Sequence, residues 1–270
     1  MLNDQTYHPA GYLFRLSFME LWRNRFGLVL LVTIPLIFLA VVEGTSGTQT
    51  IPIKLFFGDE TREILLSQHS VNLVFIGSAV LGFLTAYYAI ILFHRNFEYY
   101  KYCIGIGLSP ASFLAARGLF FLTVILLLGG MISLAVSGMV DIQQAAGLFL
   151  GFVLIGVIYG IIGGILGVIS SDFMVAILGV VLLANLDAGW LQNPVFYTSA
   201  QETDLIQWLP AFFPTQVVFA AAFTDDWNSR GLWMSLLLTF VLTIVLFGII
   251  YLKIYRVRRW QNRSDTYIMK

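Results

Sequence analysis

The sequence predicts an all-α integral membrane protein, and three observations lead to this fold class. Of the 270 residues, 59% are hydrophobic and only 11% are charged, whereas a soluble domain carries about 25% charged residues. Apolar runs of the length that a helix needs to cross a bilayer recur along the chain. Lys and Arg lie almost entirely on one side of these runs, as cytoplasmic segments of membrane proteins do. We therefore expect a single transmembrane domain over residues 1–270.

The first expected element is an interfacial elbow helix over residues 10–26, which are too polar to span a membrane. Its large apolar side chains share one helical face at i, i+4, i+7 and i+8, namely Phe14, Phe18, Leu21 and Trp22. The roughly opposite face is polar, with Ser17, Glu20 and Asn24. Such a helix lies along the headgroups. An ordinary basic flank of the first span is the alternative.

Six membrane spans follow from the apolar runs. They are expected at residues 27–42, 71–93, 118–140, 147–169, 173–190 and 231–252. The loop over residues 43–70 is expected outside, with a short strand over 51–57 and a helix over 60–69. The outer region 191–230 contains a short, interrupted apolar run, which predicts a half-buried helix or a re-entrant segment. Asp187, near the outer end of the fifth span, is expected to be a solvated helix-end residue.

The distribution of cations gives the orientation. With both termini in the cytoplasm, the outer side holds three cations, Lys54, Arg62 and Arg230. The inner side holds the other twelve, Arg15, Arg23, Arg25, Arg95, Lys101, Arg117, Lys253, Arg256, Arg258, Arg259, Arg263 and Lys270. This strong bias predicts cytoplasmic N and C termini.

Glycines recur at helical spacing in the fourth span. They form small-xxx-small pairs over Gly147, Gly151, Gly156, Gly160 and Gly164, with a further pair at Gly163 and Gly167. Glycine at this spacing lets helix backbones approach closely in lipid. The pattern predicts tight helix packing.

No catalytic or metal-binding pattern is found in the sequence. There is no G-x-x-x-x-G-K-[ST] phosphate loop and no H-E-x-x-H motif. None of His8, His69 and His94 has a second His or Cys four residues away, and Cys103 is the single cysteine. Ion-driven carriers need charged groups within their spans, and here only Asp187 comes near one. We expect no enzymatic activity in this chain, and we expect the energy source of any transport to lie elsewhere.

The longest polar interruption expected in the cytoplasm runs from His94 to Arg117. It contains Phe97-Glu98, then Gly107-Leu108-Ser109-Pro110-x-Ser112, and it ends at Arg117. A second group of aromatic and proline residues lies in the outer region: Asn193-Pro194-x-Phe196-Tyr197, Trp208-Leu209 and Phe213-Pro214. With six spans behind an elbow helix, these features resemble the type-2 permease subunits of ATP-binding-cassette exporters. Tyr99-Tyr100-Lys101-Tyr102 stands where that family has an Arg/Glu-Gly-Thr run.

The resemblance implies partners and a division of labour. Two ATPase subunits would bind ATP and Mg²⁺ in place of this chain, and a second permease copy, identical or homologous, would complete a dimer. The segment 94–117 would be the cytoplasmic coupling region. The residues expected to contact the ATPase or shape that region are Arg95, Glu98, Tyr99, Tyr100, Lys101, Tyr102, Ser109 and Pro110.

The resemblance also implies a path for the cargo between the two copies, along the second and fifth spans. The polar residues expected on it are Asn72, Ser78, Thr85, Tyr88 and Asn185. Such sparse polar groups suit a hydrophobic or amphipathic cargo, such as a drug, lipid or peptide, exported across a bacterial inner or plasma membrane. A polysaccharide or glycolipid exporter of the same family is one alternative. A stand-alone scaffold or carrier without an ATPase is the alternative from another class.

Overall fold

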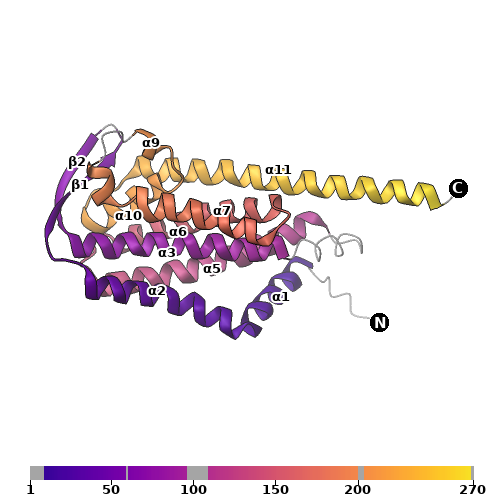
Figure 1. Cartoon of the computed structure of the whole chain (residues 1–270), viewed down its shortest axis with the longest axis horizontal. Coiled ribbons are helices and arrows are strands. Elements are labelled where there is room, and N and C mark those ends of the chain that lie inside the picture. Colours follow the sequence, from indigo (N-terminus) through magenta and orange to yellow (C-terminus); the bar gives the residue numbers. More distant parts are fainter. Residues whose placement is uncertain (1–8, 59, 96–108, 200–203, 269–270) are drawn as a thin grey trace, which may run out of the picture.

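The long helices of the protein lie side by side as a bundle. The computed structural model describes residues 9–58, 60–95, 109–199 and 204–268. The hairpin of β1 (Thr50–Phe57) and β2 (Glu60–Ser67) lies at one end of the bundle, and α1 (Pro9–Arg23) lies at the other (Figure 1). α11 (Ser229–Ile268) runs the length of the bundle and extends beyond it.

Six helices of the described chain are long and apolar enough to cross a membrane, so the chain is a multi-pass membrane protein. They are Arg25–Thr45, Gln68–His94, Ala111–Met139, Ala145–Ile169, Phe173–Leu191 and Ser229–Lys253. In Figure 1 these are α2 (Arg25–Thr45), α3 (Gln68–Ile90) with its π-helical end η1 (Ile91–Arg95), α5 (Pro110–Met139), α6 (Ala145–Ile169), α7 (Phe173–Leu186) with its π-helical end η2 (Asp187–Leu191), and α11.

The helix predicted over residues 60–69 is wrong, because most of this segment forms β2. β1 and β2 pair antiparallel, with Ile53 opposite Ile64. Gly58 in the turn has φ +71°, a conformation that glycine adopts without strain. Ile53 and Leu55 are fully buried. The strand predicted over 51–57 is present. Pairing with β1 satisfies the backbone hydrogen bonds of this segment, which a helix would have satisfied internally.

Helix α6 lies at the centre of the bundle. It packs against α3, α5, α7, α10 (Phe212–Phe223) and α11. A side chain at Gly151 would lie 2.6 Å from Val218 of α10, and one at Gly160 would lie 2.3 Å from the ring of Phe121 on α5. Glycine therefore sets the distance between α6 and its neighbours.

The outer region contains α8 (Pro194–Ser199), α9 (Asp204–Gln207) and α10. α10 is buried over ten of its twelve residues, more than the half-buried helix that its composition predicted. Its Gln216 side chain accepts a hydrogen bond from the Phe56 amide at 3.1 Å, which joins α10 to the hairpin. α10 is too short to cross a bilayer, and it packs on α6 and contacts β1 of the hairpin.

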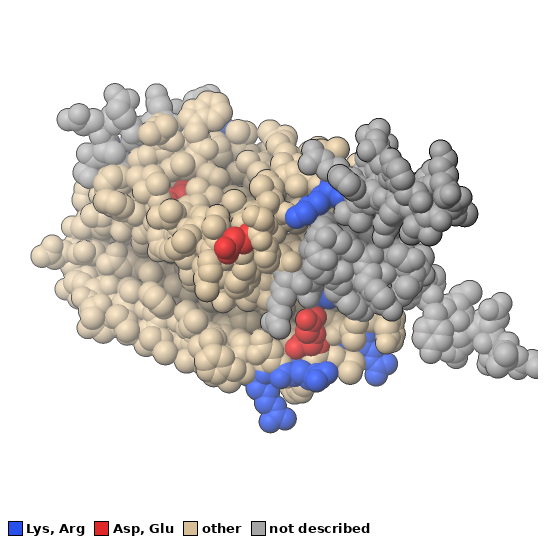
Figure 2. Space-filling model, turned by 45° about the vertical axis from the view of Figure 1, so that its right-hand side comes forward, with Lys and Arg blue, Asp and Glu red and all other residues tan. Residues whose placement is uncertain are grey.

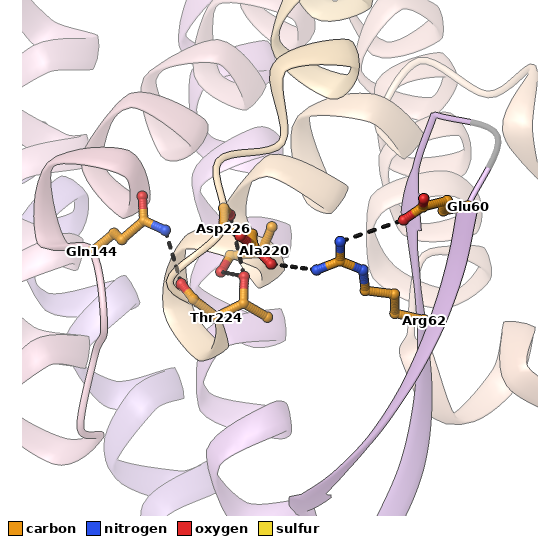
Figure 3. A network of polar contacts seen from close by, with 6 residues as sticks. All are labelled: Glu60, Arg62, Gln144, Ala220, Thr224 and Asp226. Atoms are coloured by element: carbon orange, nitrogen blue, oxygen red, sulfur yellow. Dashed lines mark hydrogen bonds and ion pairs between the residues drawn. The ribbon is translucent and has the colours of Figure 1, made fainter.

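A polar network connects the hairpin to the turn that follows α10, and this turn to the residue that precedes α6. Figure 3 shows Arg62 of β2 between Glu60 and Asp226, with which it forms ion pairs. The hydrogen bond to Asp226 is the main reason that the pKa of Arg62 is raised. Gln144 donates to the Thr224 carbonyl at 2.8 Å, and Thr224 donates to the Ala220 carbonyl at 2.8 Å. The ion pairs are exposed, so salt screens them and they add little stability.

The bundle exposes apolar surface on three of its spans. The spans differ in how much of an apolar 18-residue stretch is buried in each. The buried share is only 17% in α2 and in α11 and 28% in the α7 span, compared with 72% in α6. On the face that Figure 2 shows, most of the described surface is uncharged, with a few Lys, Arg, Asp and Glu side chains among the other residues. These spans have apolar faces available for lipid or for another membrane chain.

Candidate functional site: a charged cleft at the end of the bundle

The two ends of the predicted coupling region lie on the bundle end opposite the hairpin. On one side, His94 Nδ1 lies 3.0 Å from the Gly167 carbonyl near the end of α6. On the other, α5 begins at Pro110, and Ser109 caps it by accepting a hydrogen bond from the Ser112 amide at 3.1 Å. Lys253 of α11 donates to the Val168 carbonyl at 2.5 Å. The C-terminal carbonyls of α6 are thus bound by groups from α3 and α11.

The central part of the coupling region lies outside the described residues. This applies to Glu98, Tyr99, Tyr100, Lys101 and Tyr102. Arg95 is described as the last residue of the π-helical turn η1, at the backbone level. Ser109 and Pro110 stand at the start of α5.

A cleft of about 750 Å³ opens beside these anchors. Its walls come from α1, the end of α3 with η1, and α5, together with the α1–α2 junction. The described lining residues are Leu16, Met19, Glu20, Leu21, Arg23, Asn24, Tyr88, Ile91, Leu92 and Arg117. The volume is within the range of about 300–1,000 Å³ that small-molecule sites occupy.

Arg117 is the most buried charge in this cleft. Its side chain is only 4% exposed, and its Nη1 lies 3.3 Å from Glu20 Oε2 of α1. The guanidinium carbon also lies 5.6 Å from the centre of the Phe113 ring. The Nε–H is buried and makes no hydrogen bond. The pair with Glu20 joins α1 to α5, yet it leaves one donor of Arg117 unsatisfied.

Helix α1 packs on α5 through part of the apolar face that the sequence predicts. Phe14 meets the Phe120 ring edge-on at 6.2 Å, and Leu21 is half-buried. Phe18 and Trp22 are exposed instead. Ser17, expected on the polar face, is buried. Its hydroxyl donates to the Leu13 carbonyl of the same helix at 2.9 Å, which allows a serine to lie in an apolar contact.

The residues proposed for a cargo path between two copies lie on α3 and α7 of the single chain. Ser78 and Thr85 are buried, and each donates to a carbonyl one turn earlier in α3. Asn72 donates to Ser46 at 3.2 Å. Asn185 is exposed on α7 and donates to the Val181 carbonyl at 2.7 Å. Tyr88 alone among the five lines the cleft.

Sequence reasoning missed a second polar centre, around Asp187. Instead of being solvated, Asp187 is 1% exposed. It accepts hydrogen bonds from the Tyr159 hydroxyl of α6, from the Gln192 amide at 2.9 Å and from the Ala211 backbone N–H at 3.0 Å. Ala211 is the N-cap of α10, so this carboxylate joins α6, α7 and α10.

A weak signal for this centre exists in the sequence. Tyr159 is the one phenol in the apolar run of α6, and Gln192 follows Asp187 by five residues. The partner Ala211, however, contributes a backbone N–H that no side-chain pattern reveals. Among the described residues, no group of three or more His, Cys, Asp or Glu is arranged to hold a metal ion.

Fold and surface together define a multi-pass membrane protein with a charged cleft at one end. No protein-family model matches the chain, and no curated protein matches it.

Proposed function

We propose that this chain is the membrane-spanning permease subunit of an ATP-driven exporter. Separate ATPase subunits would bind ATP and Mg²⁺, and the cargo would be hydrophobic or amphipathic, such as a drug, lipid or peptide. The proposal rests first on the sequence resemblance of residues 94–117 and of the outer region. A second permease copy would complete the transporter in a bacterial inner or plasma membrane.

One structural observation carries the proposal: both ends of segment 94–117 are anchored to the core helices. At its first residue, His94 contacts the Gly167 carbonyl, so η1 is held against α6. At its last residue, Arg117 on the second turn of α5 pairs with Glu20 of α1 at 3.3 Å. A force applied to this segment would therefore reach α3, α5, α6 and α1 together. Hydrogen-bonded helices move as rigid bodies when one end is displaced.

The exposed apolar spans support the second copy. α2 and the α7 span bury little of their apolar surface within one chain. A two-fold pair would cover part of it, since a symmetric dimer uses the same patch on both subunits. The cargo would then move between the two copies.

The test is co-purification. The tagged chain is purified from its native membranes in a mild detergent, and ATP hydrolysis by the eluate is measured. We expect ATPase activity with the wild type and at least about tenfold less with Glu98→Arg, because like charges at a docking contact cost several kcal/mol. The control is Glu63→Arg, which makes the same charge change at an exposed position of β2 and should retain the activity.

A carrier that works without an ATPase is the second candidate, and Asp187 is the observation that favours it. Buried carboxylates within spans mark ion pathways in carriers. This candidate predicts that the wild-type protein purifies without ATPase activity and that Glu98→Arg leaves transport unchanged. These two results together would contradict the exporter.

A further inference from the structure

We propose that the cleft between α1, α3 and α5 binds the phosphate-bearing headgroup of an anionic phospholipid. The cleft has a volume of about 750 Å³, and its lining contains buried as well as exposed residues. Three features of its lining select this ligand: its charge, an unsatisfied buried donor, and the distribution of its apolar side chains.

The charge of the described lining favours an anion. Arg23 and Arg117 contribute two positive charges, and Glu20 contributes one negative charge. Since Arg23 is exposed and Arg117 is 4% exposed, one cation lies near the solvent and the other lies deep. A phosphate that entered between them would be held from two sides.

The buried donor gives the anion a specific partner. Arg117 Nε is buried and has no hydrogen-bond partner, although a buried polar group without one is costly. The guanidinium fork matches two oxygens of a phosphate, which makes Arg the preferred residue for such groups. Glu20 occupies Nη1 only, so the Nε edge is left for the ligand.

The apolar part of the lining identifies the source of the phosphate as a lipid. Half of the described lining residues are aliphatic: Leu16, Met19, Leu21, Ile91 and Leu92. A free phosphate would leave these side chains without a partner, whereas the glycerol and first acyl carbons of a phospholipid would contact them. The cleft also lies where α1 and the ends of two spans meet, at the end of the bundle opposite the hairpin (Figure 1), which is the level at which headgroups lie.

The test uses the purified full-length chain alone in a non-ionic detergent. Dioleoylphosphatidylglycerol or dioleoylphosphatidylcholine is titrated in, and the rise in melting temperature gives an apparent Kd. We expect phosphatidylglycerol to bind at least about tenfold more tightly than phosphatidylcholine. Arg23→Gln should weaken phosphatidylglycerol binding about fivefold, since each cation near a headgroup contributes a factor of this order. Arg15→Gln removes an exposed charge from the same helix but outside the cleft, and should have no effect.

A gain-of-function variant strengthens the test. Glu20→Gln removes the one negative charge of the described lining, which repels the lipid phosphate, so it should tighten phosphatidylglycerol binding several-fold. Glu20 is 57% exposed, so this change is compatible with folding. Arg23→Gln tests the same cleft independently of Glu20.

Three results would overturn the proposal. Equal binding of the two lipids, or equal effects of Arg15→Gln and Arg23→Gln, would show that the cleft is not the site. Full stabilisation by inorganic phosphate alone would assign the site to a soluble anion. The measurement needs no ATPase, so its failure leaves the proposed function standing and is distinguishable from failure of the co-purification test.

Discussion

Replacing Asp187 with alanine is expected to lower the free energy of unfolding by about 3 kcal/mol or more. Three buried donors would lose their acceptor: the Tyr159 hydroxyl, the Gln192 amide and the Ala211 N–H. Each buried donor left without a partner costs about 1–3 kcal/mol. Because Ala211 caps α10, the loss should also loosen the packing of α10 on α6. The unfolding of the purified chain in mixed micelles, titrated with sodium dodecyl sulfate, measures this effect.

The asparagine variant makes this prediction sharper. Gln192 Oε1 is buried without a hydrogen-bond partner. In Asp187→Asn, rotation of the Gln192 amide would turn this oxygen toward the new Asn N–H₂ group, while the Asn carbonyl still accepts from Tyr159 and Ala211. We therefore expect Asp187→Asn to cost much less than Asp187→Ala.

The matched control is Asp172→Ala, at the other end of α7. Asp172 caps this helix by accepting from the Met174 amide at 2.7 Å, and it is exposed. Loss of such a cap costs about 1 kcal/mol. If Asp187→Ala were no more costly than Asp172→Ala, the carboxylate would not hold the three elements together.

The second large effect is expected from Gly163→Ala in α6. The added methyl group would lie 2.2 Å from the Ala86 carbonyl oxygen and 2.8 Å from the Ala86 Cα, both in the backbone of α3. A backbone cannot rotate away as a side chain can, so α3 and α6 must separate. Overpacking of this kind costs about 1–3 kcal/mol, and more where the backbone must move. We expect the same unfolding titration to show a loss in this range or above it.

Gly248→Ala on α11 is the control for this substitution. It makes the same chemical change within a helix, but nothing lies within 4 Å of the added methyl group. Alanine favours the helix over glycine by about 0.5–1 kcal/mol, so the variant should be as stable as the wild type or slightly more stable. Equal losses from both variants would mean that the α3–α6 contact does not depend on glycine.

The spans were predictable because a bilayer demands long apolar runs, and such runs are local in the sequence. α6 was expected at residues 147–169 and occupies Ala145–Ile169. The hairpin was only half predictable. A strand was expected over residues 51–57 although they alternate poorly, whereas β2 depends on a partner strand that local periodicity does not reveal.

Only the start of α5 beside the candidate site could be predicted from the sequence, and the contacts within the site could not. The Ser-Pro step indicated where a helix restarts, and α5 begins there. The pairing of Glu20 with Arg117 joins residues 97 positions apart, and nothing in the two local patterns links them. Asp187 was misread for a similar reason: its position near the end of a span suggested solvent, whereas Tyr159 and the start of α10 cover it.

Photo-cross-linking from position 100 tests the central claim of the account most directly. A photoreactive amino acid replaces Tyr100 in the coupling region, and a second variant carries it at Leu65, which is 71% exposed on the hairpin. Native membranes are irradiated, and the adducts are identified by mass spectrometry. The account predicts an adduct with an ATP-binding protein from position 100 and none from position 65. The account would be contradicted if position 100 gave no adduct with an ATP-binding protein after irradiation.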